Sequence, residues 1–320
     1  MVLDFINGPL DGDAWEKLCD SCYRMRYQEQ NYQKVQAVLG GDGGIEGFTK
    51  NGIVYQCYCP EREYNDDELY EHLRDKMTKD IAKLVKEEYS TKLKTFGIYN
   101  IVEWHFVIPQ YKDPRILQHA EKKRKEVMLL KEKNPEKYDY IDDNFQIIIK
   151  VAEDFKIELT RIIRTNLSDI KLNVACYHDG KVEWDKCDSE KVDNIKRKVK
   201  AVMNIKDDEE DEDFNYIVST YVESYIKGIE IFKTLRVSYS EVYEDIFRLK
   251  ETYTKEVSVR TRMNRDSTIN SKIFYDIMDD FEAKLKESFS SYLSVASIGE
   301  LKTDIISAWL ADCSMQFRSR

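Results

Sequence analysis

The stretch GDGGIEG, followed ten residues on by Gln-Cys-Tyr, brings together residue types that bind a hard metal ion. Asp42 and Glu46 lie within a run of glycines, Gln56 follows, and Tyr58 comes two residues later. Glycine tolerates positive φ angles and lets the backbone approach a ligand closely. Carboxylate and amide oxygens are ligands for Mg²⁺, a cation that acidifies bound water and stabilises charge on a phosphate. The pattern predicts a site for Mg²⁺ or Mn²⁺ at Asp42, Glu46 and Gln56.

A β-hairpin must position these side chains. Residues 45–48 and 53–58 are predicted strands, and the Asn-Gly pair between them is a strong signal for a tight hairpin turn. Alternate residues of a strand share a face, so Gln56 and Tyr58 point the same way. If the strands pair around this turn, Glu46 comes close to both side chains.

The rest of the first half alternates between helical and strand patterns. Apolar residues at three- and four-residue steps predict a helix from Asp13, with Asp11 or Asp13 as its N-cap. Further helices are predicted at 66–94, 115–133 and 154–167, and further strands at 101–109, 145–151 and 171–177. This alternation is typical of an α/β structure with the sheet inside.

The second half has only helical patterns. The predicted helices are 189–203, 214–234, 239–257, 267–295 and 298–317. The simplest organisation is an α/β domain over residues 1–180 and an all-α helical domain over residues 181–320, the latter serving assembly or partner binding.

At this point the chain resembles a known family. The sequences WEKLC in the first helix, GDGGIEG in the glycine run and VYQCY in the second hairpin strand are similar to the PD-(D/E)XK nuclease superfamily, nearest its Mrr-like and defence-associated branch. The resemblance covers residues 10–109. It implies a restriction-endonuclease-like mixed sheet flanked by helices.

The resemblance also implies roles for individual residues. The first acid of the family falls on Glu46, with Asp42 just before it, and the second metal-site position falls on Gln56. The helix acid of such folds falls on Glu16. The catalytic lysine of the family falls on Tyr58, whose hydroxyl donates a hydrogen bond but carries no positive charge at neutral pH.

Two consequences of Tyr58 stay open. Either another lysine supplies the positive charge, with Lys50, Lys76 and Lys79 as the candidates, or cleavage is weak or absent.

The function implied is that of a metal-dependent DNA nuclease, or a nuclease-like DNA-binding component, of a bacterial anti-phage defence system. The chain has no P-loop motif, which leaves room for a separate ATPase or sensor protein in an oligomer or hetero-complex. The alternative is a catalytically degenerate nuclease scaffold that acts as an adaptor in an ATPase-containing complex. Tyr58 and the acidic composition favour this alternative.

The formal net charge of −10 argues against a protein that coats nucleic acid, which would normally be basic. A nuclease would instead need a local basic patch, and residues 122–125 (KKRK) and 259–265 (VRTRMNR) are the candidates. The plainer interpretation of each is a solvated helix surface.

The seven cysteines do not have the spacing of a disulfide framework. Four of them, Cys19, Cys22, Cys57 and Cys59, are alternative zinc ligands, although cysteine on an apolar helix face usually behaves as a small hydrophobe. The sequence begins without a signal-peptide pattern and has no apolar run of membrane-spanning length, so we expect a cytoplasmic protein with no membrane partner.

Overall fold

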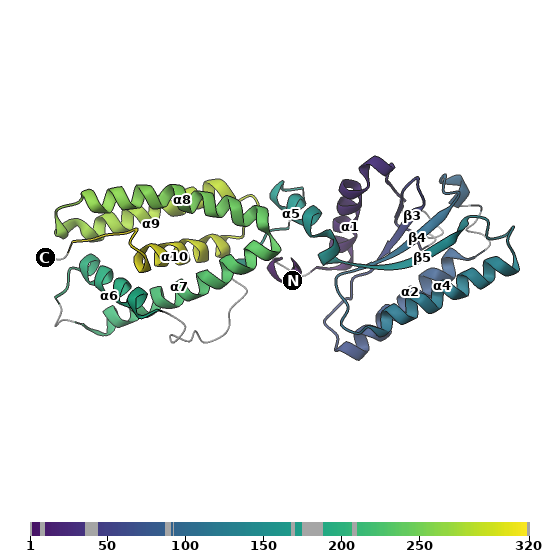
Figure 1. The fold of residues 1–320 in the computed structure, drawn as a ribbon, viewed down its shortest axis with the longest axis horizontal. Helices are drawn as coiled ribbons and strands as arrows, with labels where there is room; N and C mark the ends of the chain where they lie inside the picture. Colours follow the sequence, from purple (N-terminus) through teal and green to yellow (C-terminus); the bar gives the residue numbers. More distant parts are fainter. Residues whose placement is uncertain are drawn as a thin grey trace. The chain divides into compact units, whose positions relative to one another are not determined.

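A five-stranded mixed sheet with helices on both faces forms the first structural unit of the chain (Figure 1). The computed structural model describes residues 2–6, 10–35, 44–86, 91, 93–167, 170–174, 188–206 and 210–318. The chain divides into two units, one formed by Gly8–Ile162 and the other by Met1–Asn7 together with Ile163–Arg320. The boundary between them therefore falls at Ile162, and not near residue 180.

The strand predicted over 171–177 explains this difference. In the described part of that segment, Leu172 makes only isolated bridges, to Ile6 and to Leu293, and both partners belong to the helical unit. Leu172 and Val174 are fully buried. Leu172 is therefore part of the helical unit and not of the five-stranded sheet.

The sheet has the strand order β1-β2-β3-β4-β5. Its strands are β1 (Gln33–Lys34), β2 (Gly47–Phe48), β3 (Ile53–Cys57), β4 (Ile101–Ile108) and β5 (Ile141–Val151). The first three strands pair antiparallel, whereas β3, β4 and β5 pair parallel. A mixed sheet results, with a hairpin meander at one edge and helical crossovers at the other.

The helices of this unit are α1 (Gly12–Arg26), α2 (Asp66–Leu84), α4 (Arg115–Lys133) and α5 (Lys156–Arg164), the last of which extends to the unit boundary. Helices α2 and α4 connect consecutive parallel strands and cover one face of the sheet, while α1 covers the other (Figure 1). Both crossovers lie on one face because successive right-handed connections advance in the same direction along a sheet.

Side-chain caps fix where two of these helices begin. Asp11 accepts a hydrogen bond from the Ala14 N–H at 2.8 Å, and Asn65 accepts one from the Glu68 N–H at 2.9 Å. Each cap satisfies a backbone donor that has no partner within its helix. The core between the sheet and the α2–α4 layer is apolar and contains Trp104, a fully buried residue of β4.

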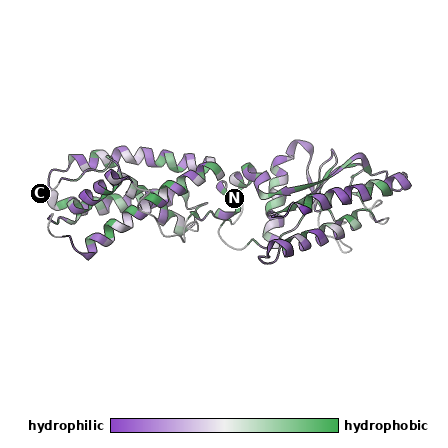
Figure 2. Cartoon of the chain, turned by 60° about the horizontal axis from the view of Figure 1, so that its bottom comes forward, coloured by the Kyte–Doolittle hydropathy of each residue, from purple (hydrophilic) through white to green (hydrophobic). Residues whose placement is uncertain are grey.

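Five helices make up most of the second unit. They are α6 (Ser189–Met203), α7 (Glu212–Ser238), α8 (Ser240–Met263), α9 (Asn270–Phe289) and α10 (Val295–Ala311). Hydrophilic and hydrophobic residues alternate around these helices, as expected where one stripe faces a core and the other faces water (Figure 2). No helix in the described ranges has the length and apolar character needed to cross a membrane.

Candidate metal and phosphate site

The hairpin β2–β3 brings Glu46 and Gln56 together, as the sequence pattern predicts. Gly47 pairs with Tyr55, and the Glu46 N–H donates to the Tyr55 carbonyl at 2.8 Å. From the end of β2, the Glu46 carboxylate accepts a hydrogen bond from the Gln56 side-chain amide. At the other end of the hairpin, Gly52 has a φ of +96°, which allows the tight turn.

The Glu46 carboxylate is held by donors from both the backbone and side chains of β3. Its second oxygen accepts from the Cys57 N–H at 3.2 Å and from the Cys57 thiol. A hydrogen bond with the Cys19 thiol, burial and the Glu46 charge raise the pKa of the Cys57 thiol, so it stays protonated and acts as a donor. These contacts fix the carboxylate at the end of the strand.

Gln56 contributes an amide that is only partly satisfied. Its side chain is 3% exposed, and its Oε1 has no hydrogen-bond partner within the described ranges. A buried polar atom without a partner is uncommon and costs free energy unless a water or an ion occupies the neighbouring space. The Gln56 amide therefore lies beside the Glu46 carboxylate, and the oxygen of that amide has no hydrogen-bond partner among the described residues.

The glycine run is anchored at its C-terminal end. Gly44 has a φ of +73°, and a Cβ built there would lie 2.7 Å from the backbone oxygen of Asp80 in α2. The Trp104 indole N–H donates to the Gly44 carbonyl at 3.1 Å. Gly44 is therefore clamped between α2 and β4, two residues before Glu46. Asp42 lies outside the described residues.

Glu16 forms an ion pair that the sequence did not suggest. Its carboxylate lies 2.9 Å from the Lys34 ammonium, which connects α1 to β1. Lys34 pairs in register with Gly47, the residue after Glu46. The hydrogen bond that the Lys34 ammonium donates to Glu16 raises the pKa of Lys34, and the charges of Asp20 and Glu46 act in the same direction.

Sequence reasoning missed Lys34 because β1 is only two residues long and has no periodicity of its own. The signal that could have found it is the pairing of a third strand with the hairpin. Once β1 lies against β2, Lys34 is in register with Gly47.

Tyr58, at the position where the resemblance expects lysine, is half-buried against the core and hydrogen-bonds through its backbone to Val107 at 2.9 Å. Burial raises the pKa of its hydroxyl, so it is neutral. Of the lysines considered as substitutes, Lys76 pairs with buried Asp80 at 2.9 Å. Lys50 lies over the Phe48 ring, beyond the end of β2 that is opposite Glu46.

Lys79, the third lysine considered, is exposed on α2.

An aromatic layer supports the hairpin on its α1 face. Tyr23 of α1 stacks on Tyr55 of β3 with ring centroids 4.0 Å apart. The Tyr55 hydroxyl is 3.0 Å from that of Tyr32, which donates to Asp20 at 2.6 Å. This network fixes α1 against the strands that carry the site.

His105 of β4 belongs to the same layer. Its Nδ1 lies 2.7 Å from the Tyr23 hydroxyl, and its Nε2 lies 2.7 Å from the Glu103 carboxylate. Both ring nitrogens are therefore satisfied in the interior, as expected for a histidine that belongs to the core.

The four cysteines considered as zinc ligands do not form one ligand set. Cys19 contacts Cys57, whereas the Cys59 thiol donates to the Leu10 carbonyl at 3.0 Å. No group of three or more histidine, cysteine or acidic side chains arranged to hold a metal is found within the described ranges. Asp42, the third predicted ligand, is outside those ranges.

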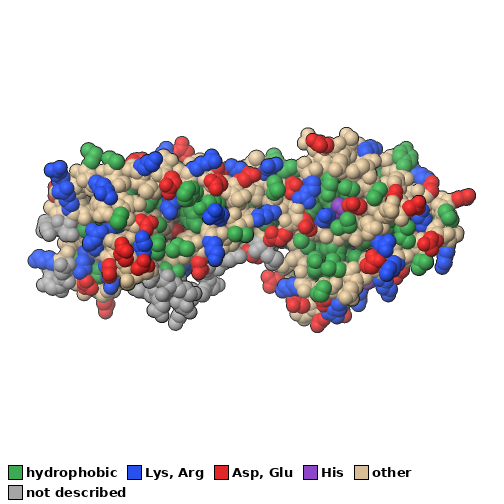
Figure 3. Space-filling model, in the orientation of Figure 1, with side chains coloured by type: hydrophobic (Ala, Val, Ile, Leu, Met, Phe, Trp, Pro, Cys, Tyr) green, Lys and Arg blue, Asp and Glu red, His purple; other side chains and the backbone are tan. Residues whose placement is uncertain are grey.

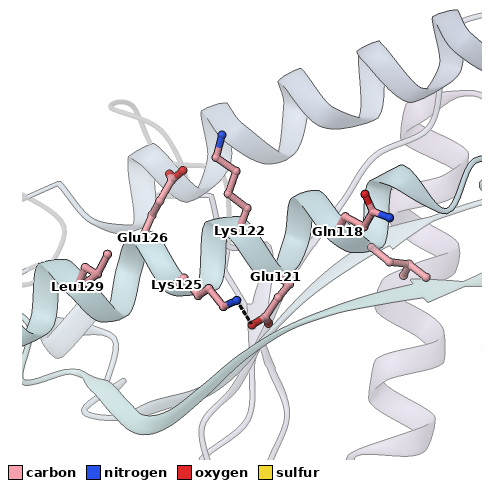
Figure 4. A pocket seen from close by; sticks show the side chains of 7 residues that line it. Gln118, Glu121, Lys122, Lys125, Glu126 and Leu129 are labelled. Atoms are coloured by element: carbon pink, nitrogen blue, oxygen red, sulfur yellow. Dashed lines mark ion pairs between the residues drawn. The ribbon is translucent and has the colours of Figure 1, made fainter.

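The basic segment of α4 is largely neutralised by acids of its own helix. Arg124 pairs with Glu121 at 2.8 Å, and Lys125 lies 3.6 Å from the same carboxylate. Glu121 and Lys125 border an open surface depression on α4 that Leu117 and Leu129 also line (Figure 4). On the face drawn in Figure 3, positive and negative side chains are interspersed. The solvated-surface interpretation of residues 122–125 therefore has the better support.

The second basic segment, at the end of α8, is paired as well. Arg260 lies 2.6 Å from Asp280, and Arg262 donates to the Cys313 carbonyl at 3.1 Å.

Comparisons of the chain with protein-family models, with curated proteins and with solved structures find no match.

Proposed function

We propose that this protein is a metal-dependent nuclease that acts on DNA, with Glu46 and Gln56 at the metal site and Asp42 as a further ligand. The order helix, three-stranded meander, helix, parallel strand supports a restriction-endonuclease-like arrangement. In this proposal the protein works in a bacterial defence complex, together with an ATPase or sensor protein.

The observation that carries the proposal is the contact between Glu46 and Gln56 across the hairpin, with Gln56 Oε1 buried and without a hydrogen-bond partner among the described residues. A carboxylate and an amide oxygen are a suitable pair of ligands for Mg²⁺. When bound there, the metal would acidify a water molecule and stabilise negative charge on a phosphodiester. The Glu46 carboxylate and the Gln56 amide would fit such an ion, because rotation of the Gln56 amide would turn its oxygen towards the Glu46 carboxylate.

The residues of the chain have distinct roles in this proposal. Glu46 and Gln56 bind the ion, and the clamp on Gly44 fixes the backbone that leads into Glu46. The stacked rings of Tyr23 and Tyr55 hold the hairpin rigid from the α1 side. A ligand set needs such support, because small displacements of ligands weaken binding and catalysis.

A second candidate function is a nuclease-like scaffold that does not cleave. Two observations favour it. The Glu46 carboxylate already accepts hydrogen bonds from Gln56 and Cys57, and Tyr58 is neutral where a cation is expected. In this case the helical unit would carry the function by binding a partner protein.

The test compares the wild-type protein with Glu46→Gln on supercoiled plasmid DNA, in Mg²⁺ and separately in Mn²⁺. Glutamine keeps the shape of the side chain and removes its charge. Glu61→Gln, a change at an exposed glutamate after the same strand, is the matched control. We expect cleavage by the wild type and by Glu61→Gln, and a loss of at least about a hundredfold in Glu46→Gln.

Calorimetric titration with Mn²⁺ alone gives an independent readout. Binding that is lost in Glu46→Gln and kept in Glu61→Gln supports the metal site. If the folded wild type neither binds Mn²⁺ nor cuts DNA in either metal, the nuclease proposal is wrong and the scaffold alternative stands.

A further inference from the structure

The outward face of α4 combines exposed leucines with charges of both signs. Leu117 is 46% exposed and Leu129 is 52% exposed. They line an open depression of about 650 Å³, whose other lining residues are Gln118, Glu121, Lys122, Lys125 and Glu126 (Figure 4). The inward face of the same helix is apolar and is buried in the core of the α/β unit. The outward leucines therefore do not serve that core.

Four of the lining residues form a single row along α4. Leu117, Glu121, Lys125 and Leu129 follow one another at steps of four residues, and all four are exposed. Residues four apart are neighbours on a helix surface, and at 1.5 Å per residue the row is about 18 Å long. The row reads leucine, acid, base, leucine. Read in the opposite direction, it is complementary to itself.

Such a row matches a second copy of this chain. If two α4 helices pack antiparallel about a two-fold axis, Leu117 lies opposite the partner's Leu129 and Glu121 lies opposite the partner's Lys125. The axis repeats both contacts, because a symmetric interface uses the same surface of each protomer. Two ion pairs then lie at the centre of the contact, with a pair of leucines at each end.

The remaining charges of this face do not oppose the contact. Arg124 lies 2.8 Å from Glu121, and Lys123 lies 2.7 Å from Glu126, so both cations have an acid on their own helix. Lys122 and Glu126 form a neighbouring row with one charge of each sign (Figure 4). A strongly acidic or strongly basic partner would meet like charges here, whereas a second copy presents the same mixture in reverse order.

We propose that this face of α4 is the interface of a homodimer, in which the row from Leu117 to Leu129 pairs antiparallel with the same row of a second copy. The inference is independent of the proposed nuclease function. Within one chain, Lys125 is 3.6 Å from Glu121, and the two side chains are 67% and 47% exposed. Exposed ion pairs of this kind are weak, so Lys125 is available to a partner.

The contact is small. Stable protein interfaces bury at least about 1,000 Å², and a single helix face provides less than this area. We therefore expect a reversible dimer with a dissociation constant on the order of tens of micromolar.

The experiment measures the dimer fraction of the full chain by sedimentation velocity, from about 5 to about 300 µM, for Glu121→Lys and Lys125→Glu. Each variant alone places like charges opposite each other at both central contacts. We expect each to dimerise at least about tenfold more weakly than the wild type. An equimolar mixture of the two variants restores two opposite-charge pairs between protomers, so we expect the dimer fraction to return close to that of the wild type.

Two further variants complete the test, and circular dichroism verifies that each variant is folded. Lys284→Glu reverses an exposed lysine of α9 that pairs with Glu287 of its own helix at 2.8 Å, and it should dimerise like the wild type. Leu129→Lys leaves the ion pairs of α4 in place and should weaken dimerisation about tenfold, because it places a charge against the partner's Leu117.

A wild type that stays monomeric up to about 300 µM would overturn the inference. A dimer that is unaffected by the three α4 variants would overturn it as well. If both charge reversals weaken the dimer and mixing them restores nothing, the antiparallel pairing of Glu121 with the partner's Lys125 is wrong. These outcomes leave the nuclease proposal untouched, since that proposal is tested with Glu46→Gln.

Discussion

The polar groups around the hairpin of the α/β unit and one buried acid of the helical unit are in different surroundings. In the α/β unit they are joined into a network around the hairpin, where Tyr23, His105 and Glu103 bond in sequence. In the helical unit, a single carboxyl group, Asp304 of α10, is 2% exposed and neither of its oxygens has a hydrogen-bond partner among the residues described. A hydrogen-bonded network can hold functional side chains in place. An isolated buried acid mainly makes the stability of the fold depend on pH.

The helical unit also shows how a buried charge can be accommodated. Lys198 of α6 is fully buried, and its ammonium donates to the carbonyls of Trp309 and Leu310 at the C-terminal end of α10. A cation is favourable there because the last carbonyls of a helix lack partners and carry the negative end of its dipole. Asp304 lies within the same helix and has no such compensation.

The largest effect is expected from Asp304→Asn. Burial, and then the charge of Glu300, raise the pKa of Asp304 to about 8 although Lys227 opposes the shift. The folded state therefore holds a proton that the unfolded state releases near pH 4, so stability falls as pH rises from about 4 to about 8. We expect a loss of about 5.5 kcal/mol over this range in the wild type, at about 1.4 kcal/mol per pH unit, and a much flatter profile in Asp304→Asn.

Urea unfolding at a series of pH values checks this expectation. Glu244→Gln, at an exposed position of α8, is the control and should retain the wild-type slope. A wild-type stability that is constant or rises between pH 5 and about 8 would show that Asp304 is compensated in solution.

Gly44→Ala tests the packing around the hairpin of the α/β unit. The substitution places a Cβ 2.7 Å from a backbone oxygen of α2 at a φ of +73°. We expect destabilisation by about 3 kcal/mol, because both the steric contact and the backbone conformation are unfavourable. Gly12→Ala is the matched control, since a Cβ at Gly12 meets nothing within 4 Å.

Amide hydrogen exchange shows which elements of the protein lose stability in Gly44→Ala. Faster exchange in β2, β3 and α2, with α7 and α10 unchanged, is the expected result for Gly44→Ala. Equal acceleration in the helical unit would contradict the division of the chain into separately packed units.

The smallest effect is expected from Tyr23→Phe. The change removes the hydroxyl that bonds His105 Nδ1 and keeps the ring that stacks on Tyr55. Loss of one buried hydrogen bond that leaves its partner unsatisfied should cost about 1.5 kcal/mol in unfolding free energy. Tyr216→Phe, at an exposed tyrosine, is the control. If both changes lower the unfolding free energy in urea by the same amount, the hydrogen bond between Tyr23 and His105 contributes no stability.

Much of the local structure could be predicted from the sequence, and the reasons are local. The Asn-Gly pair predicts the turn between β2 and β3, and side-chain alternation along those strands predicts that Glu46 meets Gln56. The helices of the second half follow from their apolar spacing, although the predicted 267–295 helix ends at Phe289, and α10 begins at Val295.

The remaining features needed the tertiary structure. Lys34 lies opposite Gly47 only because β1 pairs with β2, and Tyr23 bonds His105 although the two residues are 82 positions apart. Asp304 is buried because α10 packs against Gly228 of α7. Periodicity along a chain reports which side chains share a face of one element, because it follows from the geometry of that element. The residues opposite that face are chosen by packing between elements that are distant in sequence.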